Sequence, residues 1–325
     1  MRRHFFAALL ALATGFTGPS ALAQGPDADA APITLIIPFA TGGSTDALAR
    51  LIGDHVAREL KRPVVMQNIG GAGSTIGLAK LARAAPDGLT IGIGTTAGMV
   101  INPLIKPRTV PYKPVEDFAP ITRFTQSSHL LVVNKDFPAD NVAQLLAYLK
   151  ANPGKATFGT PGIGTNQQLA GEMLQVMTGT QMVHVPYTGS NQVLTDLVGG
   201  RVDMTFDQAP QLLPHIRAGK LKVLGFTGPE RPAFDRSIPT IGETVPGFSL
   251  VGWHGFFAPA RTPPAVVENL SRVIREFMAR PDTLAKFEGL GVTGVSTTQQ
   301  QLATFLAADI ERARPVVTKA GMVER

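Results

Sequence analysis

At 325 residues the chain is long enough for two lobes with a large core, and it contains no cysteine. This composition excludes disulfides, cysteine nucleophiles and thiolate metal sites. The formal charge of +6 comes from scattered basic residues, and aromatic residues make up only 6%, so nucleic-acid binding is not expected. The mild positive charge would attract anionic ligands, or it could serve solubility alone.

The amino terminus has the pattern of a secretory signal peptide. Arg2 and Arg3 precede an apolar run over 5–12, and Ala21-Leu22-Ala23 is a small-residue cleavage signal. We therefore expect residues 1–23 to be removed, and the mature protein to be soluble and periplasmic. The apolar run is too short for a membrane span, and no cysteine near the cleavage site could carry a lipid anchor.

Residues 33–46 predict an anion site. A β-branched run over 33–39 indicates a buried strand, and Gly42-Gly43 breaks it. From Thr45 the apolar residues return with helical period, so a helix begins at this turn. The first amides of a helix lack partners inside it and face the positive end of the helix dipole. Glycines beside them allow an anion to approach the backbone.

Two further stretches repeat this arrangement. Residues 64–74 end in Gly70-Gly71-Ala72-Gly73-Ser74 before a helix predicted over 75–84. Residues 157–165 contain Gly162 and Gly164 before a helix with apolar residues from Leu169 to Met177. Three glycine loops at helix starts could converge on one small anion.

The remaining pattern alternates strands with helices. We predict strands over 64–66, 90–94, 118–124, 130–134, 202–206, 222–226 and 253–258, and a strand followed by a turn within 184–189. Helices are predicted over 141–151, 191–198, 210–218, 263–280, 282–289 and 298–320, with a further helix from about 95 to 102 and Pro-rich connections over 103–120 and 228–247. This alternation predicts parallel α/β architecture, in which ligands bind beyond the carboxyl ends of the strands.

Several catalytic and cofactor sites are not supported. Gly71-Ala-Gly73 is followed by Ile76 where a dinucleotide fingerprint needs glycine, and no loop has the Gly-Lys-Ser/Thr of a P-loop. The histidines share no metal-ligand spacing, and no G-x-S-x-G elbow is present. No cofactor, metal or catalytic residue is expected. Loops without Lys or Arg suit a carboxylate better than a polyphosphate.

Each candidate also has a purely structural interpretation. The glycines could serve only as turn residues, and Ser44, Ser74 and Thr165 only as helix caps. Asp46 and Asp207 lie where an acid complements a helix start. His184 fits local packing or hydrogen bonding. Phe39 and Trp253 fit a hydrophobic core better than ligand stacking.

Seven ordered segments resemble the substrate-binding proteins of tripartite tricarboxylate transporters, the Bug family, over essentially the whole mature chain. The segments are 38–50, 68–77, 162–172, 184–189, 196–203, 214–221 and 253–259. The resemblance implies an α/β, two-lobed type II periplasmic binding protein fold (Venus flytrap) with two interlobe crossovers, near 127–131 and 249–254. Lobe 1 would be 31–128 plus 252–325, and lobe 2 would be 129–251.

The resemblance also implies a carboxylate held mainly by the three loops, often through ordered water. The matching positions are Phe39, Thr41, Gly42, Gly43, Ser44 and Asp46 in the first loop, Gly70, Gly71, Ala72, Gly73 and Ser74 in the second, and Gly162, Gly164, Thr165, Asn166 and Gln168 in the third. Tyr187, Gly189 and Asp207 could border the cleft from lobe 2.

Two positions depart from the family pattern. Thr41 stands where the family often has proline, and Gln168 stands where it usually has histidine. Because glutamine cannot carry a positive charge, lobe 2 would favour a ligand with one carboxylate or a neutral distal end.

The implied function is an extracytoplasmic receptor that closes on a small organic carboxylate and presents it to a membrane permease. We expect a monomer that does no chemistry on its ligand. Two alternatives stay open: a ligand-binding protein of a membrane signalling system, and an exported enzyme acting on a carboxylate. Dicarboxylates, tricarboxylates, amino acids and aromatic acids all remain candidate ligands.

Overall fold

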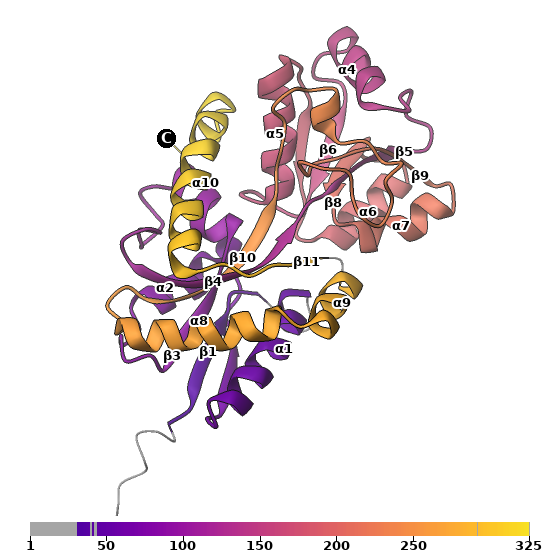
Figure 1. Ribbon diagram of the computed structural model, residues 1–325. Helices are drawn as coiled ribbons and strands as arrows, with labels where there is room; N and C mark the ends of the chain where they lie inside the picture. Colours follow the sequence, from indigo (N-terminus) through magenta and orange to yellow (C-terminus); the bar gives the residue numbers. More distant parts are fainter. Residues whose placement is uncertain (1–30, 40, 42–43, 291, 325) are drawn as a thin grey trace, which may run out of the picture.

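The computed structural model describes residues 31–39, 41, 44–290 and 292–324. These residues form two α/β lobes, each built around its own β-sheet (Figure 1). The two-lobed binding-protein fold expected from the sequence is confirmed. The predicted signal peptide, residues 1–23, lies outside the described residues. No helix of the described part of the chain is long and apolar enough to cross a membrane.

The first sheet has the strand order β11-β4-β10-β3-β1-β2. Its strands are β1 (Ile33–Ile37), β2 (Val64–Asn68), β3 (Thr90–Thr95), β4 (Phe118–Ser127), β10 (Gly252–Pro259) and β11 (Thr293–Gly294). β1 pairs in parallel with β2 and β3, but β10 is antiparallel to both β3 and β4. The prediction of parallel architecture was therefore wrong in part, because a strand from the end of the chain enters the sheet in the opposite direction.

Helices cover both faces of the first sheet, as the side-chain alternation of β1 requires. Ile33, Leu35 and Ile37 pack with one set of helices, and Ile36 packs on the opposite face. The first set is α1 (Ser44–Glu59), α8 (Pro264–Met278) and α9 (Pro281–Gly289), and the other face carries α2 (Thr75–Ala82) and α10 (Gln299–Lys319). Each fully buried Leu or Ile contributes roughly 1.5–3 kcal/mol.

The second sheet has the strand order β7-β6-β8-β5-β9. Its strands are β5 (Leu130–Asn134), β6 (Thr157–Thr160), β7 (Val183–Pro186), β8 (Met204–Asp207) and β9 (Leu221–Phe226). Side chains of α4 (Val142–Ala151) and α5 (Asn166–Thr178) pack in one apolar cluster with this sheet, and those of α6 (Ser190–Val198) and α7 (Ala209–Arg217) pack in another. β6, β7 and β8 run parallel, and β5 is antiparallel to β8 and β9.

Two crossovers join the sheets. The chain passes from the end of β4 at Ser127 to the start of β5 at Leu130, and it returns to the first sheet at Gly252. α10 packs beside α5 across the boundary between the lobes (Figure 1). Trp253 Nε1 donates to Asp309 of α10 at 2.8 Å, and Arg312 Nη1 donates to the carbonyl of Ser249 at 2.9 Å. The last helix therefore holds the second crossover.

Three short elements differ from the sequence expectation. The helix predicted from about 95 to 102 is a π-helical turn, η3 (Ala97–Ile101), followed by α3 (Asn102–Ile105). The connection over 228–247 contains a 3-10 turn, η4 (Ile241–Glu243), closed by a Thr240–Glu243 capping box. The two-residue strand β11 was not predicted, because two residues carry no periodicity.

Candidate functional site

The three glycine loops begin at the carboxyl ends of parallel strands. In each sheet the crossovers to the other lobe lie at this same end of the strands. β1, β2 and β3 are parallel, so the first and second loops follow the same edge of the first sheet. His254 of β10 pairs with Thr95, the last residue of β3, which places the second crossover at that edge too. In the second sheet, Leu130 of β5 pairs with Asp207, the last residue of β8. The third loop, which follows the parallel strand β6, therefore lies at the edge next to the first crossover.

The first loop is tied to the second strand through Asp46, whose exposed fraction is only 2%. Arg50 donates to both oxygens of this carboxylate, from Nε and Nη2, at 3.0 Å each. Asn68, the last residue of β2, donates from Nδ2 to Asp46 Oδ1 at 2.8 Å and to the carbonyl of Phe39 at 3.1 Å. Asp46 thus fixes the loop, and its bound arginine partly neutralises it.

The other predicted residues of the first loop are placed as follows. Phe39 is half-buried and packs edge-on against His254 at 6.4 Å between ring centroids, and Thr41 is exposed. Ser44 is the first residue of α1. Gly42 and Gly43 lie outside the described residues.

The second loop has an unusual backbone. Four successive residues have positive φ: Gly71 (121°), Ala72 (46°), Gly73 (60°) and Ser74 (72°). Gly70, Gly71, Ala72 and Gly73 are exposed, so their backbone is open to a ligand. Positive φ at Ala72 and Ser74 costs of order 1–3 kcal/mol each and persists only where the surroundings impose it. This strain makes the second loop a candidate functional loop.

The buried Ser74 side chain helps to hold the second loop in place. Its exposed fraction is 2%, and its Oγ lies 3.1 Å from Thr95 Oγ1 at the end of β3. Thr95 Oγ1 also accepts from the Gly98 amide at 3.1 Å. The Ser74 hydroxyl therefore anchors the loop to η3.

Asn102 joins the second and third loops, and the sequence analysis did not identify it. Its Nδ2 donates to the carbonyl of Gly73 at 2.8 Å. A Cβ added at Gly73 would lie 2.3 Å from Asn102 Nδ2, and one at Gly164 would lie 2.4 Å from Asn102 Oδ1. Each lobe thus presents a glycine to the same buried carboxamide.

The third loop is closed by its own side chains. Gly162 and Gly164 have φ of 146° and 77°. Thr165 Oγ1 donates to the Gly162 carbonyl at 2.8 Å and accepts from the Gln168 amide at 3.3 Å, which caps α5. Gln168 Oε1 accepts from the Gly164 amide at 2.8 Å, so this carboxamide turns back onto its own loop. Burial raises the pKa of Glu172, and hydrogen bonds from Gln168 and Gln175 oppose that shift.

Polar groups of lobe 2 gather next to the third loop. Gln167 Nε2 donates to Asp207 Oδ1 at 3.3 Å, and Asp207 has an exposed fraction of 4%. A Cβ at Gly252 would lie 2.5 Å from Asn166 Nδ2, so Asn166 faces the second crossover. Gly189 precedes α6 and has open space in front of it. Tyr187, by contrast, donates its hydroxyl to Asp196 at 2.8 Å and so supports α6.

His254 of β10 lies between α1 and β4 of the first lobe. Its Nδ1 is 2.7 Å from Thr125 Oγ1 and its Nε2 is 3.2 Å from Thr45 Oγ1. Burial lowers the pKa of His254 to about 4. The ring is therefore neutral at pH 7 and supplies no charge to the site.

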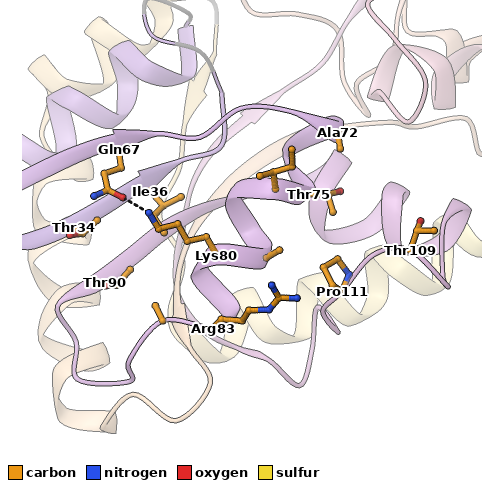
Figure 2. A pocket seen from close by; sticks show the side chains of 13 residues that line it. Thr34, Ile36, Gln67, Ala72, Thr75, Lys80, Arg83, Thr90, Thr109 and Pro111 are labelled. Carbon is orange, nitrogen blue, oxygen red and sulfur yellow. Dashed lines mark hydrogen bonds between the residues drawn. The ribbon is translucent and has the colours of Figure 1, made fainter.

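A cavity of about 800 Å³ lies elsewhere, on the first lobe (Figure 2). It is lined by the outer side of α2 and by β1, β2 and β3, and Lys80 there donates to Gln67 at 2.9 Å. Of the predicted site residues, only Ala72 lines it. This open groove behind α2 is distinct from the site where the glycine loops meet.

The described residues contain no group of three or more His, Asp or Glu side chains arranged to hold a metal ion. The loops offer backbone amides, hydroxyls and carboxamides, which suits reversible binding of an anion. Besides Asn102, the sequence analysis left Asn68 and Thr95 out of the site. Their signal is position, because each is a polar residue at the end of a strand that pairs in parallel with β1.

Comparison with known proteins agrees with this geometry. The family model described as "Tripartite tricarboxylate transporter family receptor" matches residues 48–322. An R. palustris protein solved with adipate is 32% identical, with a TM-score of 0.79 over 89% of this chain and 97% of its own. The periplasmic binding protein BugD is 31% identical, with a TM-score of 0.76 over 90% and 99%. MatC from Rhodopseudomonas palustris, with bound malate, is 30% identical, with a TM-score of 0.76 over 88% and 98%.

The match spans both lobes and all but the first four residues of α1. The sequence resemblance to this family is thus confirmed, and the chain belongs to the tripartite tricarboxylate transporter family of periplasmic solute receptors.

Proposed function

We propose that the protein binds a small organic carboxylate between its lobes and delivers it to the permease of a tripartite tricarboxylate transporter. The observation that carries this proposal is the pair of glycines, Gly73 and Gly164, which approach one buried asparagine from opposite lobes. A ligand held by both loops would favour the closed arrangement of the lobes, because it can bridge them only there.

The chemistry of the loops supports a carboxylate. Residues 157–168 and 183–190 contain no Lys or Arg, and the cation nearest the first loop, Arg50, already pairs with Asp46. Neutral donors at helix starts are sufficient for one carboxylate, whereas a polyphosphate would call for more positive charge. The adipate and malate bound by the two R. palustris neighbours belong to the same chemical class.

The finer assignments belong to the same proposal. Residues 1–23 would direct export and be removed, so the mature chain would act as a periplasmic monomer. Lobe 1 would comprise residues 31–128 plus 252–325, and lobe 2 residues 129–251, which agrees with strand membership of the two sheets. The ligand would touch the three loops and leave unchanged, because the described residues beside the loops include no catalytic constellation.

The test is a thermal-shift and calorimetry screen of residues 24–325 against small carboxylates. A ligand at a hundred times its dissociation constant stabilises the native state by about 2.7 kcal/mol. Gly73→Val should abolish the shift, since its side chain would enter the space of Asn102 and displace the loop. Gly219→Val is the matched control, because Gly219 has a similar φ of 66° but nothing within 4 Å.

Wild-type affinity in the Gly73→Val protein would overturn the site assignment. Absence of binding by every carboxylate, with no acid found by mass spectrometry of the purified protein, would overturn the ligand class. Turnover of a bound compound would instead support an enzyme, and co-purification with a kinase would support a sensor.

A further inference from the structure

Asp207 is a carboxylate inside a site that is built for an anion. It ends β8, which runs parallel to β6, so it stands level with the start of the third glycine loop. With an exposed fraction of 4%, it has little water around it. A second negative charge in the ligand would be repelled here, so this residue bears on which carboxylates the site accepts.

Within the described structure, only one of the two carboxylate oxygens of Asp207 accepts hydrogen bonds. Oδ1 accepts from the Gln208 amide at 2.8 Å and from Gln167 Nε2 at 3.3 Å. A role in holding the start of α7 explains these bonds. Among the described residues, no donor bonds to Oδ2, which is not itself fully buried, and no Lys or Arg pairs with the carboxylate. An ionised carboxylate this buried normally has a charged or strong donor opposite it.

Two neighbouring groups also lack partners. His129 Nδ1 and Asn166 Oδ1 are buried without a hydrogen-bond partner in the described structure. His129 has an exposed fraction of 2% and directly precedes Leu130, which pairs with Asp207. Burial lowers the pKa of His129, and the Asp207 charge opposes that shift. Unpaired buried polar atoms of this kind are rare and call for a missing partner.

We propose that Asp207, with His129 and Asn166, forms a subsite for the distal end of the ligand, and that this end carries an ammonium group. The inference rests on the proposed function, in which the carboxylate of the same ligand binds the glycine loops. The ligand is then an amino carboxylate with its two charges at opposite ends. A hydroxyl would be a weaker substitute, because it donates without adding a charge. A second carboxylate would be repelled by Asp207, so the ligand would differ at its distal end from the dicarboxylates adipate and malate bound by the two R. palustris neighbours.

The experiment compares ligands that differ only at the distal end. Pentanoate, 5-hydroxypentanoate, 5-aminopentanoate and glutarate share one carboxylate and chain length, and the same four end groups are tested on three-, four- and six-carbon chains. Calorimetry at pH 7 should rank the amino compound first at the preferred length, roughly tenfold to a hundredfold tighter than the alkyl acid. The dicarboxylate should bind most weakly.

Asp207→Asn keeps the shape of the side chain and removes its charge. In this variant the amino compound should lose at least about tenfold in affinity, and glutarate should gain. Asp136→Asn is the matched control, because Asp136 is a lobe 2 carboxylate with 76% of its side chain exposed, paired with Lys135 beyond the far end of β5. It should leave the ranking unchanged.

The outcomes separate the two proposals. Carboxylates that bind wild type with a dicarboxylate ranked first, or an amino preference that survives Asp207→Asn, would overturn the ammonium subsite and leave the receptor proposal standing. If no carboxylate binds at all, both fail. The wild-type ranking decides the question even if Asp207→Asn does not fold.

Discussion

The second and third glycine loops are held in shape by different means. The second loop, in lobe 1, holds Ala72 and Ser74 at positive φ and depends on Asn102 and Thr95 from another segment. The third loop, in lobe 2, confines its positive φ values to glycines and is closed by Thr165 and Gln168 from its own helix. The conformation of the second loop is imposed by tertiary contacts, and that of the third loop is specified by its own sequence.

This difference predicts how each loop fails. The third loop should keep its shape as long as α5 forms, because its hydrogen bonds lie within seven residues. The second loop should lose its shape when a distant support is removed, even though its own sequence is intact. Four predictions test this contrast.

Gly164→Val should have the largest effect. The side chain would meet Asn102 Oδ1 and Ile105 Cδ1, so the two lobes could not close and affinity should fall by about a hundredfold or more. Small-angle scattering should show a larger radius of gyration with ligand present. Gly179→Val, at a φ of 66° with nothing within 4 Å, controls for backbone strain.

A double-mutant cycle sharpens this test. Asn102→Ala in the Gly164→Val background removes Asn102 Oδ1, the atom nearest to the added side chain, and leaves Ile105 Cδ1, so part of the closure should return. Strict additivity of the two changes would show that the lobes do not meet through Asn102.

Asn102→Ala alone should destabilise the protein by about 1–2 kcal/mol and weaken ligand binding roughly tenfold, because the Gly73 carbonyl loses its donor. Asn134→Ala is the matched control. Asn134 Nδ2 makes the same kind of bond to the Leu197 carbonyl at 2.8 Å, away from the loops. Urea denaturation and calorimetry should show similar stability losses and an affinity loss in Asn102→Ala only. Equal affinities in the two variants would contradict a support role.

The free energy of unfolding should depend on pH through His254, which lies in β10 of lobe 1. The pKa of His254 is lowered to about 4 by burial, below its unfolded value near 6.5. The folded state therefore binds fewer protons, and its stability is full above pH 6.5 and falls as the pH drops towards 4. Because the ring is only partly buried, we expect a loss of roughly 1–2 kcal/mol. His254→Gln should flatten this part of the urea-denaturation curve, and an unchanged slope would refute the assignment.

Thr165→Ala should have the smallest effect. Loss of the α5 cap costs about 1 kcal/mol and should weaken ligand binding only a few-fold, because Gln168 still closes the loop. Thr298→Ala removes the equivalent cap of α10 and should give a similar stability loss with no change in affinity. A large affinity loss in Thr165→Ala would mean that its hydroxyl contacts the ligand directly.

Periodicity and turn residues were sufficient to predict most elements of the fold. The helices over 141–151, 263–280 and 298–320 were predicted to within about two residues. Each has one apolar face, the first and third begin with a side-chain cap, and the second begins with proline. The direction of β10 was not predictable, since its pattern is the same whichever way it runs. Whether a sheet is parallel depends on which strands become neighbours, and that is a long-range property.

The candidate site was predicted in its loops but not in its supports. Glycines at helix starts carry a local signal. Asn102 carries none, because Asn102-Pro103 also fits the end of a helix, and its contacts come from residues 29 and 62 positions away. Likewise, Asp46 was a candidate ligand contact, and its bonds to Arg50 and Asn68 appear only in three dimensions.

The position of β10 in the first sheet has a consequence for how the protein forms. β10 lies between β3 and β4 but begins at residue 252, whereas every strand of the second sheet is complete by residue 226. A chain that emerges amino terminus first would expose the edges of β3 and β4 until almost four-fifths of it has emerged. Lobe 2, although second in sequence, can assemble first, and the apolar strands of lobe 1 would be the segments that need protection until β10 arrives.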